Sequence, residues 1–218
     1  MLRYEVLSLI GVTGLFSYGF QFELERGQFN VIAMFIAILG VWIYRQQSRY
    51  RYFGLVLLTI AVQLKIYPFL LILLLVKDLR VWREYVKDLA LFVAINFALL
   101  FLLGKNAFLQ FVHAIITQSI YPQNWTGNHS IRSYVIEVLK PGQNTGFTGT
   151  SLFSTTTQIT LLLITLLSIL IVFLVTSKSK QSGLNSPLLL TCTLGMLIIP
   201  SVSHDYTLSL LPGSIGAF

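Results

Sequence analysis

A lysine and a proline interrupt a long apolar run of the chain. The run extends over Phe53–Val76, and its interruption at Lys65–Pro68 reads KIYP. A cation in hydrocarbon is costly unless it faces a cavity or an anionic partner. Proline ends the helix that precedes it, so we expect two short helices that meet at this point. A fixed positive charge at such a break predicts a place for a phosphate or a carboxylate.

Three further groups of polar residues lie near the ends of apolar segments. They are Glu25, Arg26, Gln28 and Asn30; the run Ser203–Tyr206, with His204 and Asp205; and Asn128 with Arg132. A histidine can accept a proton from a hydroxyl group, and an arginine can hold a phosphate through two parallel hydrogen bonds. The histidines are too scattered for the ligand spacing of a metal site, so we predict none.

The composition is typical of an integral membrane protein. Of the 218 residues, 55% are hydrophobic and 11% are charged, whereas soluble domains contain roughly 25% charged residues. A single cysteine, Cys192, excludes an internal disulfide. The net charge of +7 could indicate a nucleic-acid partner, but the basic residues concentrate on one side of the expected membrane domain, so we expect no nucleic acid as a partner.

The apolar segments predict an all-α, polytopic bundle. A bilayer core of about 30 Å requires roughly 20 apolar residues per helix. Six segments are candidates, several of them short: Glu5–Phe20, Phe29–Tyr44, the interrupted run, Leu89–Gly104, Ile159–Thr176 and Leu184–Pro200. Short spans suggest a cavity recessed at one end. We expect a single transmembrane domain over residues 1–218, with an outer loop at about 105–158.

Basic residues indicate that the interrupted run is a hairpin. An arginine-rich turn at residues 45–51 precedes the run, and a second basic cluster beginning at Lys77 follows it. By the positive-inside rule both clusters should be cytoplasmic. They can share one side only if Phe53–Val76 turns back at Lys65–Pro68. The tip of this hairpin and the other polar groups would then lie on the outer face.

The order of these motifs resembles polyprenol-phosphate-mannose-dependent glycosyltransferases of the GT-C superfamily, in particular glycosyltransferase family 87. The matching elements are RGQxN at Arg26–Asn30, the arginine-rich turn, KxYP at Lys65–Pro68, a basic turn and a Ser-x-x-His-x-Tyr-like element at Ser201–Tyr206. The resemblance implies a membrane enzyme that moves a hexose, with mannose favoured, from a polyprenyl-phosphate carrier to a lipid or glycan acceptor. The lipid-linked sugar is then the donor, and no cofactor is expected.

The resemblance also suggests individual roles. Lys65 would neutralise the carrier phosphate as negative charge develops on its leaving oxygen, and Arg26 could share this task. His204 would accept the proton of the acceptor hydroxyl, and Asp205 would orient the imidazole or bind a sugar hydroxyl. The other residues expected to bind substrate are Glu25, Gln28, Asn30, Tyr67, Asn128 and Arg132.

One departure from the family concerns the catalytic acid. Family members usually carry an acidic residue in the first outer loop of a longer chain, and we assign neither Glu23 nor Glu25 to that role. We therefore expect a fragment of a larger multi-pass enzyme, which alone could lack the catalytic acidic residue. Its expected location is the bacterial cytoplasmic membrane rather than the endoplasmic reticulum.

Other functions account for some of the same residues. A transporter or flippase for an anionic lipid-linked substrate would also need cations in a cavity, although we find no related halves. An accessory membrane subunit is favoured only if His204 and Lys65 face different compartments. Simpler roles are a lysine extended to the interface for Lys65, a solvated turn for Glu25–Arg26, and a helix cap for Gln28 and Asn30.

Overall fold

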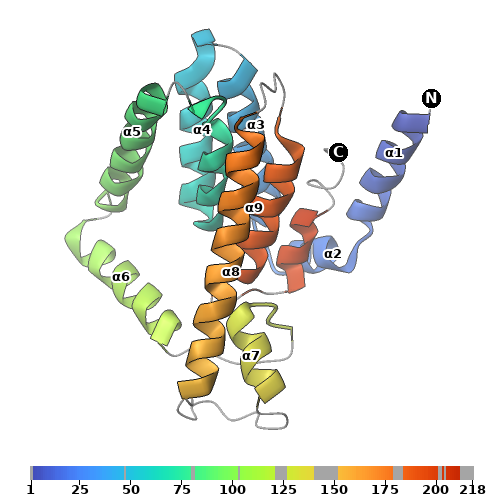
Figure 1. The fold of residues 1–218 in the computed structure, drawn as a ribbon, viewed down its shortest axis with the longest axis vertical. Helices are drawn as coiled ribbons and strands as arrows, with labels where there is room; N and C mark the ends of the chain where they lie inside the picture. The colour runs from blue at the N-terminus through green and yellow to red at the C-terminus, as the bar shows by residue number, and fades with distance from the viewer. Residues whose placement is uncertain are drawn as a thin grey trace.

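The computed structural model contains helices and, among the residues that it describes, no strand (Figure 1). It describes residues 2–46, 48–79, 82–102, 104–120, 127–139, 152–178, 184–200, 203 and 205–211. The α-helices are α1 (Leu2–Leu15), α2 (Tyr18–Glu25), α3 (Asn30–Gln46), α4 (Arg51–Leu64), α5 (Trp82–Leu100), α6 (Lys105–Ile120), α7 (Ile131–Leu139), α8 (Leu152–Thr176) and α9 (Ser186–Ile198). The 3₁₀ helices are η1 (Ser48–Tyr50), η2 (Tyr67–Leu75) and η4 (Asp205–Leu210).

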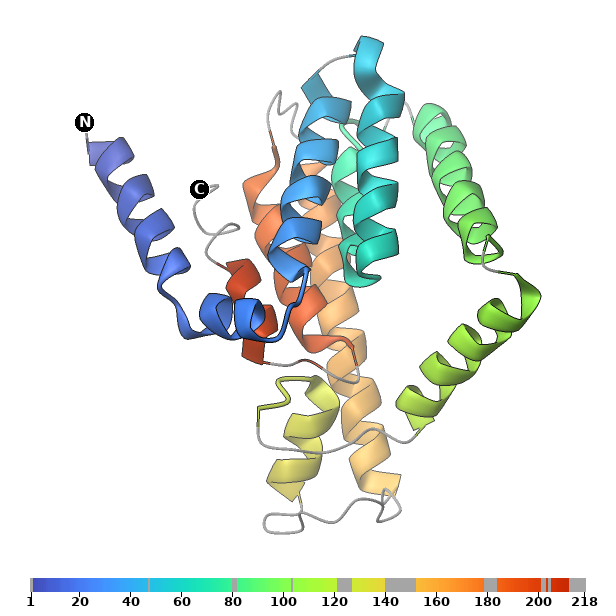
Figure 2. The same cartoon turned by 180° about the vertical axis from the view of Figure 1, so that it is seen from behind.

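The core lies between α3, α4, η2 and α9. α3 packs on α4 and η2, while α9 packs on η2 and α8. Ala37, Leu58, Leu71 and Leu189 are fully buried among these elements. α1 stands at one edge of the bundle and α5 with α6 at the other, as both views show (Figures 1 and 2).

Two glycines bring the backbones of α3 and α4 into contact. A Cβ atom added at Gly40 would lie 2.8 Å from the carbonyl oxygen of Gly54, and one added at Gly54 would lie 2.6 Å from that of Gly40. Between helices in a membrane, van der Waals packing replaces the hydrophobic effect as the driving force, so small residues favour close approach. The pair therefore fixes how closely the first arm of the hairpin lies against α3.

The interrupted run folds as the predicted hairpin. α4 ends at Leu64, and Lys65 has an extended backbone with φ −152° and ψ 134°. The returning arm, η2, has Pro68 in its first turn, where a missing N–H is tolerated, and packs against α4. The sequence predicted a short helix for this arm, and the structure winds it as a 3₁₀ helix. A 3₁₀ helix rises about 2.0 Å per residue, so its nine residues span about 18 Å, close to the roughly 21 Å of the 14-residue α4.

One helix in the described part of the chain is long and apolar enough to cross a membrane. It is α8 over Thr155–Thr176, and 6% of its most apolar window is buried inside the protein. α5 and α6 qualify only as a pair, bent by 107°, and α3, α4 and α9 are apolar but shorter. The bundle of several spans thus stays a prediction.

Three element boundaries differ from those expected. The segment Glu5–Phe20 is broken because the Ser17 hydroxyl donates to the carbonyl of Gly14 at 2.7 Å and accepts from the N–H of Phe20 at 3.3 Å, which caps α2. α5 begins at Trp82, before the predicted span. The expected outer loop at 105–158 contains α7 and the first turns of α8, in addition to α6, which the alternation of polar and apolar residues over 106–120 does predict.

The glycine contact yields a prediction about stability. Gly54→Ala should lower the free energy of unfolding by about 1–3 kcal/mol, because the new methyl group meets backbone atoms that cannot turn away. Gly195→Ala is the matched control, since its Cβ would lie 2.8 Å from the movable side-chain end of Ile169. Unfolding of both variants in detergent by titration with sodium dodecyl sulfate measures the difference. Equal losses in the two variants would contradict a special role for the contact.

Candidate functional site

Four of the predicted site residues form two hydrogen-bonded pairs at the tip of the hairpin. Lys65 Nζ donates to Gln28 Oε1 at 2.7 Å, and Tyr67 Oη donates to Asn30 Oδ1. Each pair joins residues that are 37 positions apart. The RGQxN and KxYP motifs, which are separate in the sequence, therefore form one site between the start of α3 and the break after α4.

Gly27 explains how the first motif turns toward Lys65. Its φ of 60° lies in the left-handed region, which favours glycine. The N–H of Gly27 donates to the carbonyl of Leu24 at 3.1 Å, and the N–H of Gln28 donates to that of Glu23 at 3.0 Å. These two bonds form a Schellman motif, which ends α2 and directs the chain into α3. Glu25 and Arg26 lie on this turn with exposed side chains.

Glu23 supports the site, although it was not among the residues predicted to form it. Its side chain is 2% exposed, and Oε1 accepts a hydrogen bond from the N–H of Val31 at 2.7 Å. A carboxylate at a helix N-terminus is favoured by the helix dipole and satisfies an amide of the first turn. Glu23, rather than Gln28 or Asn30, thus caps α3, and its charge also acts on Lys65. An acidic residue shortly before a predicted helix is the signal that could have identified it.

Asn30 is held inside the protein by the second pair. Its side chain is buried, and Nδ2 has no hydrogen-bond partner among the described residues. A buried donor of this kind costs about 1–3 kcal/mol, and such exceptions call for a specific explanation. A role as a helix cap does not explain why Nδ2 of Asn30 is buried without a partner among the described residues.

A second part of the site joins the start of α7 to the start of η4. Asn128 Oδ1 accepts hydrogen bonds from the N–H groups of Ser130, at 3.2 Å, and Ser203, at 2.9 Å. The N–H of His129 donates to the carbonyl of Ser203 at 2.8 Å. These bonds fix the segment that leads into η4. Asn128 therefore positions this segment through its side-chain oxygen.

The two parts lie at the same end of the fold. η4 packs on α2 and α3, and Figure 2 shows α2 and η4 side by side at the lower end of α3. Arg132 lies half-buried in the first turn of α7, and burial lowers its pKa. His204 and the side chain of Asp205, which we predicted to be catalytic, lie outside the described residues. In the part that is described, no cluster of three His, Cys, Asp or Glu could hold a metal ion.

An apolar groove opens beside the hairpin tip. It has a volume of about 290 Å³, and its lining residues come from α4, α5, α6 and the hairpin tip: Val62, Gln63, Ile66, Phe69, Val93, Asn96, Phe97, Leu100, Phe111 and Ile115. Gln63 Nε2 donates to Asn96 Oδ1 at 3.0 Å, so the polar side chains of the lining bind each other. Ile66 directly follows Lys65. Lys65 and Gln28 are not among the residues that line the groove, and the ammonium group of Lys65 lies instead against Gln28, just before α3.

A comparison with protein families identifies a match over most of the chain. The model of glycosyltransferase family 87 matches residues 5–200. This range contains both hydrogen-bonded pairs, Asn128 and Arg132, and it ends before Ser203. Comparisons with curated proteins and with solved structures give no match.

The Schellman turn yields a prediction about the geometry of the site. Gly27→Ala should destabilise the protein by about 1–2 kcal/mol, because an alanine Cβ clashes with the following carbonyl oxygen at positive φ. Gly27→Asn should cost less, since asparagine tolerates this conformation. The free energy of unfolding of both variants in detergent tests the order. A variant with asparagine that is less stable than the one with alanine would contradict this explanation.

Proposed function

Because the chain belongs to glycosyltransferase family 87, and is thus a membrane glycosyltransferase of the GT-C-like kind, we propose a specific reaction for it. It transfers a hexose, with mannose favoured, from a polyprenyl-phosphate carrier to a lipid or glycan acceptor. The observation that carries this proposal is the cation of Lys65, held by Gln28 at a helix break. Such a cation can bind the phosphate of a polyprenyl phosphate, and we assign its apolar chain to the groove that Ile66 lines at the same break.

Lys65 acts on the leaving group in this proposal. The bond between the anomeric carbon and the phosphate oxygen breaks, and the oxygen keeps the electron pair. Lys65 stabilises the negative charge that develops there, and Gln28 orients the ammonium group in advance. Gln28 is neutral, so it fixes the ammonium group without cancelling its charge. The nearby carboxylate of Glu23 is engaged by the N-terminus of α3.

The acceptor is activated at the other part of the site. The acceptor oxygen forms the new bond to the anomeric carbon, and His204 takes up its proton, with Asp205 as the orienting or sugar-binding group. The bonds of Ser203 with Asn128 and with the N–H of His129 support this assignment, because they hold the residue before His204 in place. Arg26 and Arg132 are the additional cations proposed for the phosphate or the acceptor.

The remaining residues are proposed to bind the sugar. Tyr67 and Asn30 form one hydrogen-bonded unit, in which the buried Asn30 holds the half-buried Tyr67, the member proposed to contact the sugar. Glu25 lies on the exposed turn before them. The proposal needs no cofactor and no metal ion.

The proposed setting is the bacterial cytoplasmic membrane, crossed several times, with the site on the outer face. The two basic clusters support this orientation, because Arg45 lies at the end of α3 opposite to the site. The match to the family gives no support to the alternative of a transporter or flippase.

Removal of the charge of Lys65 tests the donor site. Lys65→Gln should lower kcat by about 10²–10³-fold, the cost of losing one group that stabilises the leaving oxyanion. Transfer of radiolabelled mannose from synthetic polyprenyl-phosphate mannose, by protein in nanodiscs, measures the rate. Lys105→Gln, at an exposed lysine at the start of α6, is the matched control and should leave the rate unchanged. Full activity of Lys65→Gln would refute the proposed role.

A second variant separates donor binding from acceptor activation. His204→Ala should reduce transfer by about 10²–10⁴-fold, the usual contribution of a general base. It should not weaken binding of the polyprenyl-phosphate donor, whereas Lys65→Gln should weaken it. Equilibrium binding of the labelled donor to each variant measures this split. Equal loss of donor binding in both variants would argue against His204 as the base.

A further inference from the structure

A network of hydrogen bonds among charged side chains holds together the end of the bundle opposite to the candidate site. Tyr44 and Arg51 both bind the carboxylate of Asp88, and Arg51 Nε also donates to Tyr44 Oη at 3.2 Å. Arg45 donates to the carbonyl of Leu74 at 2.7 Å. Lys77 Nζ in turn donates to the carbonyl of Arg45. We call the charged members of this network, Arg45, Arg51, Lys77 and Asp88, the basal group.

The basal group carries more positive than negative charge. Its members are three cations and one carboxylate, and Arg45 and Asp88 are buried. Burial and then the charges of Arg45 and Arg51 lower the pKa of Lys77. An anion beside Lys77 would relieve the repulsion.

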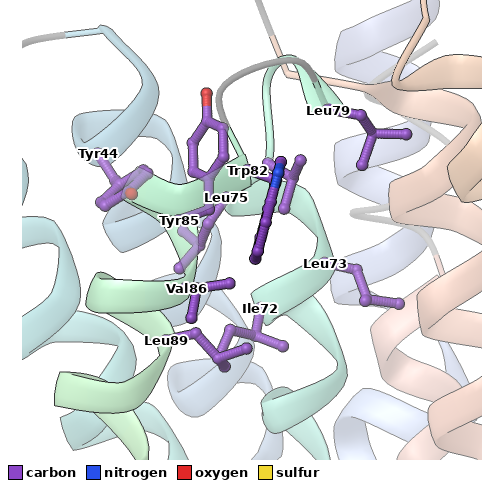
Figure 3. Close-up of a pocket in the computed structure, with 10 residues that line it drawn as sticks. Tyr44, Ile72, Leu73, Leu75, Leu79, Trp82, Tyr85, Val86 and Leu89 are labelled. Carbon is purple, nitrogen blue, oxygen red and sulfur yellow. The ribbon is translucent and has the colours of Figure 1, made fainter.

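An apolar pocket adjoins the basal group. Its volume is about 140 Å³, and its lining residues are Tyr44, Ile72, Leu73, Leu75, Val76, Leu79, Trp82, Tyr85, Val86 and Leu89. Figure 3 shows Trp82, Val86 and Leu89 of α5 grouped with Ile72 and Leu75 of η2. Tyr44 belongs to the lining and also bonds within the network, while Val76 directly precedes Lys77. The pocket therefore adjoins the basal group at Tyr44, and the ammonium group of Lys77 binds the carbonyl of Arg45, the next residue.

We propose that this pocket binds one acyl chain of an anionic phospholipid from the leaflet at this end of the fold, with the lipid phosphate at Lys77. Trp82 is 54% exposed at the pocket, and tryptophan is enriched where membranes meet water. Transfer of an acyl chain from a bilayer into an apolar pocket changes its free energy little, because both surroundings are apolar. The charged head group therefore decides which lipid is held.

This lipid site is distinct from the transferase site. Asn30 begins α3 and Tyr44 lies near its other end, so a separation of 14 residues places the two sites about 21 Å apart. The inference depends on the membrane setting proposed above, but not on the reaction. A bound phospholipid would join α3, η2 and α5 through the charges that otherwise repel one another.

Quenching of Trp82 fluorescence tests the proposal. In a Trp42→Phe, Trp125→Phe background, Trp82 is the remaining tryptophan. The protein is placed in nanodiscs of phosphatidylglycerol and phosphatidylcholine, with bromine on the acyl chains of one lipid or the other at equal total bromine. Quenching should be stronger when the phosphatidylglycerol carries the bromine. Equal quenching by both lipids would overturn the proposal.

Three variants test which cation causes the preference for phosphatidylglycerol. Lys77→Gln should reduce the preference for phosphatidylglycerol about fivefold, which corresponds to about 1 kcal/mol per cation near an anionic head group. Arg49→Gln is the matched control, because Arg49 is exposed at the same end and stacks on Tyr50 at 5.7 Å. The preference of this variant for phosphatidylglycerol should be unchanged. Equal effects of the two substitutions would show that the lipid is attracted by the positive surface in general and not by a specific site. Lys65→Gln should retain the preference, so loss of transfer and loss of lipid binding are distinguishable.

Discussion

A backbone carbonyl without a partner is costly in an apolar environment, and a broken helix exposes such groups at its ends. The hairpin of α4 and η2 meets this constraint where η2 ends. There Arg45 binds the carbonyl of Leu74, and the carbonyl of Arg45 itself accepts from Lys77. At the tip, the side chains of Lys65 and Tyr67 bind those of Gln28 and Asn30 and so attach the hairpin to the start of α3. The arrangement of the candidate site follows from these fixed ends.

The sequence allowed the hairpin to be predicted, because a proline, a lysine and two basic clusters constrain the same segment. It also allowed the residues of the two pairs to be selected, although not their partners. The order of motifs along a chain gives no distances between them, so the bond from Gln28 to Lys65 appears only in the structure. The functional roles of these residues stay predictions.

Other features depend on tertiary contacts that a single sequence does not reveal. The approach of Gly40 to Gly54 requires knowledge of which helices are neighbours. The break at Ser17 results from a side-chain bond that competes with the helix, a local effect that hydrophobic patterning misses. Hydropathy likewise gave no reason to place α7 in a polar stretch. Glu23 was overlooked because its capping role depends on a turn that Gly27 makes.

The winding of η2 has a mechanical consequence for the molecule. Rewound as an α-helix, its nine residues would shorten by roughly 4–5 Å. A displacement of that size would break a hydrogen bond. The bond between Lys65 and Gln28 and the bond between Arg45 and the carbonyl of Leu74 could therefore not both be kept. The length of the returning arm thus sets the distance between the bonds at its two ends. Its pitch ties the position of the ammonium group at one face to the bonds of the basal group at the other.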